Sequence, residues 1–259
     1  RTTASIPIGG KYRIIDFDLS NMSNSGISNV GIVAKSNFQS LMDHVGSGSA
    51  YDLSKRRSNL SILPPYDGKA FSSFVETIYN MHGYIEHCRE EYVLISQGNV
   101  ITNIDYTDVF DFHSKKKADI TLIYKNHAIP QGYDRPITLD VDNDGKVNQI
   151  FVKPGVVDKG VFNHAYGSIL IKKDLLMSEI RNAISVNQLD VRRLIQSSLG
   201  KYSIYAYENK GYCAAISSIN DYFEFNMDLM KKEVRDELFN PQRPIYTKVR
   251  DDAPSRYGL

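Results

Sequence analysis

Residues 8–17 read Ile-Gly-Gly-Lys-Tyr-Arg-Ile-Ile-Asp-Phe, and no other stretch of the chain is as distinctive. Its paired glycines allow the backbone to turn sharply or to pass close to a ligand, because glycine has no side chain to obstruct either. A lysine, Arg13 and Asp16 follow within seven residues of the first glycine. These residues alone leave two interpretations open: a structural Arg–Asp pair, or a segment that contacts a phosphate or nucleotide.

On both sides of this stretch the sequence alternates between strand and helix patterns. Short apolar runs predict strands at 29–34, 92–95, 120–124, 137–142, 146–152, 165–171, 202–207, 212–216 and 245–249. Helical spacing of apolar residues predicts helices at 18–25, 37–45, 71–89, 107–117, 173–184, 191–199 and 220–238. Strands that alternate with helices predict a mixed α/β sheet flanked by helices.

Three segments carry more specific expectations. Residues 92–95 are a continuous apolar run, which is typical of a central parallel strand covered on both faces. Residues 143–145 read Asn-Asp-Gly between two strand patterns, which predicts a hairpin whose two turn residues both have positive φ. Residues 46–69 lose all periodicity and are rich in Gly, Ser and Pro, so we expect a long loop there.

Composition limits the class of protein. The 259 residues carry 31 Lys and Arg against 30 Asp and Glu, so no large excess of positive charge points to a nucleic-acid partner. Cys88 and Cys213 lie far apart without metal-ligand spacing, which favours reduced thiols in a cytoplasmic protein. No apolar run approaches the ~20 residues that cross a bilayer, so we expect no membrane span.

The domain organisation follows from the same patterns. We expect one α/β domain over residues 1–240 and the beginning of a linker over 241–259. The chain opens at Arg1 inside a stretch that already looks structured, so we interpret it as a piece of a longer protein.

The motifs bear a specific resemblance. The stretch that begins at residues 9–17 and continues through Leu19-Ser20-Asn21 resembles bacterial and plant glucose-1-phosphate adenylyltransferases. The similarity extends to the ends of the chain through short matches at residues 24–27, 40–44, 103–106, 151–154, 211–212 and 222–227. The resemblance implies a Rossmann-like, GT-A-like nucleotidyltransferase domain. It also implies a first strand and Gly-rich loop before Arg1, and a left-handed β-helix after Leu259.

Two departures from the family pattern concern the metal. Adenylyl transfer uses Mg²⁺ to neutralise phosphate charge, and Mg²⁺ is normally held by carboxylates. One family Asp corresponds to Asn99 in this sequence, and the second corresponds to Ala215. Each change removes a negative charge and an anionic oxygen. The resemblance therefore implies no catalytic residue at these positions and no tightly bound Mg²⁺.

The remaining site candidates also come from the resemblance. Lys153 matches a family lysine that contacts glucose 1-phosphate, and Gly98 precedes the altered Asn99; a surface lysine at a strand end is the alternative for Lys153. The candidates on the phosphate or nucleotide side are Gly9, Gly10, Lys11, Arg13 and Lys35, and a solvated lysine is the alternative for the last.

The sequence retains the family motifs along its length but lacks the two site carboxylates. In this it resembles the accessory GlgD-type subunit, which implies a regulatory role in glycogen biosynthesis. Its implied partner is a catalytic GlgC-type subunit in a heterotetramer, with Mg²⁺ only in that partner; a homo-oligomer is the alternative assembly. Two other functions stay open. One is an active glucose-1-phosphate adenylyltransferase in which residues such as Asp105 hold the metal. The other is a non-catalytic sensor of a sugar phosphate or nucleotide.

Overall fold

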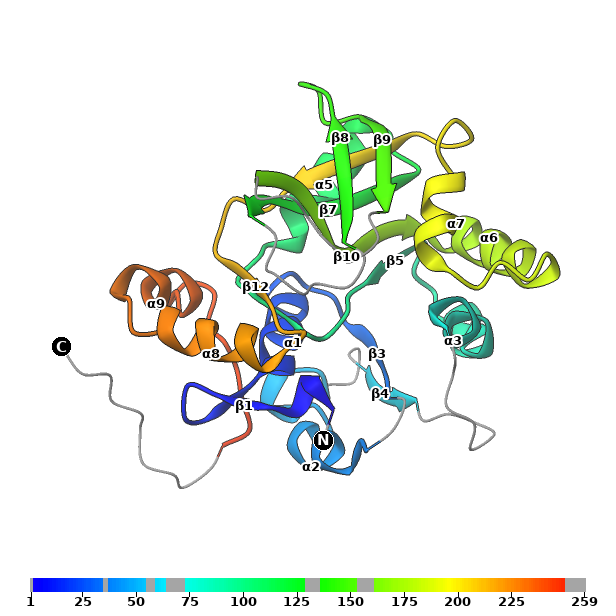
Figure 1. Ribbon diagram of the computed structural model, residues 1–259. Helices are drawn as coiled ribbons and strands as arrows, with labels where there is room; N and C mark the ends of the chain where they lie inside the picture. The colour runs from blue at the N-terminus through cyan, green and yellow to red at the C-terminus, as the bar shows by residue number, and fades with distance from the viewer. Residues whose placement is uncertain are drawn as a thin grey trace. The chain divides into compact units, whose positions relative to one another are not determined.

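The computed structural model describes residues 2–34, 37–54, 59–63, 73–128, 136–152 and 161–249. Contacts divide the chain into two compact units. Unit 1 comprises Arg1–Pro64, Gly98–Thr107 and Gly211–Leu259, and unit 2 comprises Pro65–Gln97 and Asp108–Lys210. Both contain strands and helices, so the predicted mixed α/β class is confirmed (Figure 1).

Unit 2 is built around one six-stranded mixed sheet. Its strands are β5 (Tyr92–Ile95), β7 (Ile120–Ala128), β8 (Ile137–Val141), β9 (Val147–Val152), β10 (Val161–Lys172) and β11 (Ile204–Glu208). The order is β11-β7-β10-β8-β9, and β5 pairs with the far end of β10. Only β11 and β7 run parallel; the other pairs are antiparallel. The helices of unit 2 are α3 (Phe74–Asn80), α4 (His82–His87), α6 (Lys173–Ser185), α7 (Val191–Ser197) and most of α5 (Tyr106–Lys116).

Unit 1 combines three two-stranded sheets with helices. The sheets are the β1–β2 hairpin (Pro7–Ile8 and Tyr12–Arg13), the parallel pair β3–β4 (Asn29–Val33 and Asn59–Leu63) and the antiparallel pair β6–β12 (Val100–Thr102 and Cys213–Ala215). The helical segments are α1 (Ile14–Asn24), α2 (Gln39–Val45), α8 (Ile219–Asp228), α9 (Lys232–Leu238) and two 3₁₀ turns, Thr3–Ser5 and Ser49–Tyr51.

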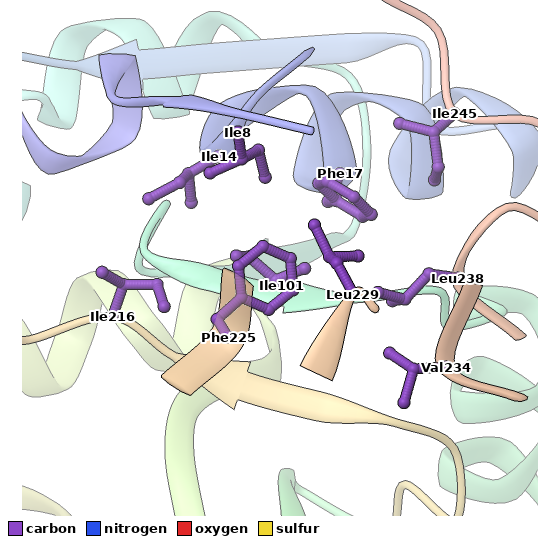
Figure 2. Close-up of a cluster of buried hydrophobic side chains, with 10 residues drawn as sticks. All are labelled: Ile8, Ile14, Phe17, Ile101, Ile216, Phe225, Leu229, Val234, Leu238 and Ile245. Atoms are coloured by element: carbon purple, nitrogen blue, oxygen red, sulfur yellow. The ribbon is translucent and has the colours of Figure 1, made fainter. Parts of the chain in front are cut away.

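Helix α1 forms the centre of unit 1, because residues 14–21 are buried without exception. Ile14 and Phe17 face one apolar cluster, which Figure 2 shows with its partners from β6, α8 and α9. Ile15 and Leu19 face a second cluster against β3 and α2. A helix buried all round must satisfy its polar residues inside the protein. Ser20 does so by accepting from the backbone N–H of Tyr246 at 2.8 Å.

The hairpin prediction is confirmed with one correction. Strands β8 and β9 pair across residues 143–145 as expected. Gly145 has a φ of +87°, but Asp144 has no positive φ. The carboxylate of Asp142 accepts the backbone N–H groups of Asp144 and Lys146, each at 2.9 Å, and so closes the turn by side-chain bonding.

Other expectations about the elements are wrong for identifiable reasons. Strand β5 is antiparallel and its residues are half-buried, because an apolar run does not report the direction of the neighbouring strand. The predicted loop at 46–69 contains a 3₁₀ turn and β4, which depends on pairing with β3, about 30 residues earlier. Residues 245–249 form no strand.

The observed bounds of several helices also differ from the bounds that the sequence predicts. Helix α1 begins at Ile14 because the carboxylate of Asp16 accepts the backbone N–H of Arg13 at 2.9 Å and caps the first turn. Helix α2, expected at 37–45, begins at Gln39 and ends at Val45 as expected, with Gly46 as its C-cap. The helix expected at 71–89 breaks at Met81.

The helix expected at 220–238 is also two helices. Residues 229–231 separate α8 from α9, and the guanidinium of Arg235 donates to the carbonyl oxygens of Leu229 and Met230 at 2.8 and 2.7 Å. These bonds satisfy carbonyls that a continuing helix would have bonded itself, which stabilises the break.

Candidate functional site

Positions 99 and 215 lie on adjoining segments of unit 1. They are the two positions where the family resemblance places metal-binding carboxylates. Asn99 immediately precedes β6, and Ala215 is the last residue of β12, the antiparallel partner of β6. The backbone N–H of Ile216 donates to the carbonyl oxygen of Asn99 at 2.9 Å. The fold therefore brings positions 99 and 215 together, although 116 residues separate them in sequence.

The chemistry at these positions is neutral. The Asn99 amide nitrogen donates to the carbonyl oxygen of Ile216 at 3.3 Å, while its Oδ1 is buried and has no hydrogen-bond partner within the described structure. Ala215 contributes a buried methyl group. A hard divalent cation requires several oxygen ligands, most of them anionic. An amide at position 99 and a methyl group at position 215 supply no anionic ligand for Mg²⁺, and the described ranges contain no cluster of three acidic, His or Cys side chains suited to a metal ion.

Asp105, the alternative metal ligand, is engaged elsewhere. Its carboxylate accepts from the Arg243 guanidinium at 2.6 Å, from the Ser25 hydroxyl at 3.2 Å and from the backbone N–H of Thr107 at 2.8 Å. Burial acts to raise the pKa of Asp105, but the hydrogen bonds from Thr107 and the charge of Arg243 outweigh it and hold the pKa below its ordinary value. The Asp105 carboxylate therefore links Arg243 to Ser25 at the end of α1. Its oxygens are bonded to protein donors, which disfavours their use as metal ligands.

Gly98 and the paired glycines adopt conformations that suit glycine. Gly98 has a φ of +64°, and a Cβ at that position would lie 3.7 Å from Ile15 and 3.8 Å from Ala4, so the constraint there is the backbone rather than space. Gly9 and Gly10, with φ values of +53° and +80°, lie in the turn of the β1–β2 hairpin. The structure thus gives these three glycines a role in turns of unit 1.

The cations of the same stretch have structural partners. Arg13 donates through its guanidinium to the carbonyl oxygen of Ser5 and, at 3.1 Å, to the hydroxyl of Ser40. The Lys11 ammonium is on the exposed hairpin turn, 4.9 Å from the ring centre of Tyr12. The two remaining lysine candidates, Lys35 and Lys153, lie outside the described residues.

A buried polar cluster that the sequence did not indicate lies beside this stretch. One oxygen of the Asp16 carboxyl contacts His44 Nε2 and accepts the Tyr51 hydroxyl, both at 2.6 Å, while the other accepts the backbone N–H of Arg13. All three side chains are buried. Burial raises the pKa of Tyr51, and the neighbouring Asp16 raises it further, so the hydroxyl stays a donor. Asp16 therefore joins α1, α2 and the turn at Ser49–Tyr51, and it also accepts the backbone N–H of Arg13.

No spacing rule could have revealed this cluster, because its members are 28 and 35 residues from Asp16. A buried Tyr–Asp–His set resembles catalytic arrangements in composition, but exclusion from solvent and complete use of the carboxyl oxygens make it a structural junction.

Two further features of the described residues lie apart from these positions. The described part of the chain includes no helix long and apolar enough to cross a membrane. A cavity of about 340 Å³ in unit 2 is lined by Glu86, Lys173, Asp174, Met177 and Arg181, none of which is a predicted site residue.

Comparison with known proteins assigns the class of this α/β fold. Residues 1–232 match the family described as nucleotidyl transferase, and the chain belongs to that family. Its relatives include a glucose-1-phosphate adenylyltransferase of Clostridium acetobutylicum, 32% identical over 98% of this chain and 68% of the relative. A second glucose-1-phosphate adenylyltransferase, from Bacillus subtilis, is also 32% identical, with the same shares covered. The glycogen biosynthesis protein GlgD of Bacillus subtilis is 28% identical over the full chain and 66% of the relative. The chain thus spans about two thirds of these relatives.

Proposed function

We propose that this chain is the nucleotidyl-transferase-like part of a regulatory, catalytically degenerate subunit of glucose-1-phosphate adenylyltransferase, acting in glycogen biosynthesis. Its relatives carry the names of that enzyme and of GlgD. The observation that carries the proposal is that Asn99 and Ala215 stand one residue out of register on the adjoining β6 and β12 segments, without a carboxylate at either position. Such a chain would act through contacts with a catalytic partner whose two states it binds differently.

An assay of the full-length protein with ATP, glucose 1-phosphate and Mg²⁺ tests the loss of catalysis. We expect turnover far below the range of ordinary enzymes, which is about 1–1,000 per second. When the protein is mixed with a GlgC-type catalytic subunit, we expect a stable hetero-oligomer with altered affinity for substrate or effector. Turnover in the ordinary range by the protein alone, or no assembly with the partner, would refute the proposal.

A metal-binding experiment tests the structural reason. The double variant Asn99→Asp/Ala215→Asp places two carboxylates on the adjoining segments, and we expect it to bind Mn²⁺ by calorimetry where the wild type does not. The matched controls are the single variants Asn99→Asp and Ala215→Asp, each of which supplies one carboxylate instead of two. Equal Mn²⁺ binding by wild type and double variant would show that these positions do not limit the site.

The active-enzyme alternative requires other ligands, and the bonds of Asp105 to Arg243, Ser25 and Thr107 weigh against that residue. The sensor alternative depends on Lys153. Calorimetry with glucose 1-phosphate on the wild type and on Lys153→Ala separates it from the regulatory proposal, because a sensor must bind the sugar phosphate and lose affinity with the lysine.

A further inference from the structure

The two longest strands of unit 2 bring two histidines and a tyrosine together within its sheet. His127 lies near the end of β7, and His164 and Tyr166 lie on β10, its antiparallel neighbour. His127 stands opposite Phe162, so His164 follows two residues later on the same face of the sheet. We call His127, His164 and Tyr166 the His–Tyr cluster.

The side chains of the His–Tyr cluster converge on one nitrogen. His127 Nε2 lies 3.4 Å from His164 Nδ1, and the Tyr166 hydroxyl contacts the same Nε2. The ring centres of His127 and His164 are 5.6 Å apart, and that of Tyr166 lies 5.3 Å from the first and 4.6 Å from the second. His164 and Tyr166 are buried and His127 is half-buried. Three donor atoms from two neighbouring strands are therefore held in one place by a rigid sheet.

The spacing of the two histidines fits ligands of a shared metal ion. Imidazole nitrogens bind zinc at about 2.0–2.1 Å in tetrahedral geometry, which places two such nitrogens about 3.3 Å apart and their ring centres about 5 Å apart. The nitrogens of His127 and His164 are 3.4 Å apart and their ring centres 5.6 Å apart. A direct hydrogen bond from an N–H group is usually no longer than about 3.2 Å. The pair is thus spaced more like two ligands than like a donor and its acceptor.

The chemistry of the three groups selects the class of ion. Imidazole nitrogen suits zinc, copper and nickel, whereas Mg²⁺ prefers oxygen ligands. When the ion binds, the O–H bond of Tyr166 breaks, an oxygen–metal bond forms and the proton leaves to water. The resulting phenolate offsets part of the charge of the ion. Lys125 stands opposite His164, but its ammonium donates to the carbonyl oxygen of Lys210 at 2.7 Å, which fixes this competing charge at that carbonyl.

We propose that the His–Tyr cluster binds one divalent ion of the zinc class and so links β7 to β10. Three protein ligands leave a fourth position for water, and the half-buried His127 beside the exposed Asn126 provides a path for the ion. The site is independent of the regulatory function proposed above, because it lies in unit 2 and disfavours Mg²⁺. Mn²⁺ stands at the weak end of the affinity series, so this site does not interfere with Mn²⁺ binding at positions 99 and 215.

Calorimetry with Zn²⁺ on the metal-stripped, full-length protein tests the proposal. In the His127→Phe variant we expect one equivalent of bound Zn²⁺ to be lost, with an affinity more than about 100-fold lower, because loss of a ligand costs more than loss of an outer partner. The matched control is His82→Phe, which removes an exposed histidine of α4 and should leave Zn²⁺ binding unchanged. No Zn²⁺ binding by the wild type, equal binding by His127→Phe, or loss of the equivalent in His82→Phe would overturn the proposal.

The ultraviolet absorption of tyrosinate gives a second test, which uses the wild type and does not depend on the folding of His127→Phe. We expect Zn²⁺, but not Mg²⁺, to produce the difference absorption of one tyrosinate in the full-length protein, because the ion displaces the hydroxyl proton of Tyr166. Tyr166→Phe should abolish this signal and weaken Zn²⁺ binding by about 10-fold or more. Tyr79→Phe is the control, because Tyr79 is exposed on α3 and outside the cluster. Absence of the signal in the wild type, or its persistence in Tyr166→Phe, would refute the site.

Discussion

Asp16 and Asn99 are two polar residues of unit 1 with opposite surroundings. The Asp16 carboxyl contacts three partners, His44, Tyr51 and the backbone of Arg13. The Oδ1 of Asn99 is buried with no partner within the described structure. The Asp16 carboxyl joins three elements of the fold, whereas the Asn99 side chain makes one long hydrogen bond and leaves its oxygen without a partner in the described ranges. The difference shows that a buried polar side chain stabilises unit 1 only as far as the fold supplies it with partners.

The largest effect is expected at Asp16. Asp16→Ala leaves His44, the Tyr51 hydroxyl and the Arg13 N–H without their acceptor inside the protein. We expect the free energy of unfolding to fall by about 3–5 kcal/mol, measured by urea denaturation. Asp108→Ala, at an exposed position of α5, is the control and should change stability by less than about 1 kcal/mol. A loss of stability in Asp16→Ala no larger than in the control would show that Asp16 does not stabilise the junction of the three elements.

Tyr51→Phe isolates the contribution of one hydrogen bond to the loss of stability expected for Asp16→Ala. It removes one donor to the Asp16 carboxyl and leaves the ring in the core, so we expect a loss of about 1.5–3 kcal/mol, as for hydrogen bonds to charged groups. Tyr79→Phe is the control, because Tyr79 is 39% exposed on α3. Urea melts of the two variants that coincide would show that the Tyr51 hydroxyl contributes nothing to the junction.

His164 of unit 2 extends the comparison to a buried side chain whose protonation changes the free energy of unfolding. Burial, and then the charge of neighbouring His127, lower the pKa of His164 from 6.5 to about 3. Between those two values the unfolded chain binds more protons than the folded one, so stability falls as the pH falls. We expect a contribution of about 1–2 kcal/mol to the loss between pH 7 and pH 5. The His164→Phe variant should show a flatter pH dependence by urea denaturation; an unchanged slope would contradict this assignment.

The smallest effect is expected at Asn99. Asn99→Ala removes a buried oxygen without a partner and one long hydrogen bond to Ile216, so we expect stability within about 1 kcal/mol of the wild type. Thermal unfolding checks this, with Asn21→Ala as the control, because the Asn21 side chain accepts from the backbone of Ile104 and donates to that of Thr102. A loss at Asn99 as large as at Asn21 would mean that the amide has a structural role.

Local signals in the sequence predicted most elements. The helix beginning near Thr107, the strands at 120–124 and 165–171, and the hairpin at 143–145 are confirmed because periodicity and turn chemistry act over a few residues. The strand β4 and the division at residues 229–231 were missed because they depend on distant partners, β3 for the strand and Arg235 for the carbonyls at the break.

The candidate site divides in the same way. The sequence by itself determined the family and showed an amide at position 99 and a methyl group at position 215, because those are facts of residue identity. Only the tertiary structure decided that the two positions adjoin across β6 and β12, that Asp105 is committed to Arg243, and that Asp16 joins three elements. Hydrogen bonds and burial act between residues that the fold brings together, and sequence separation carries no information about them.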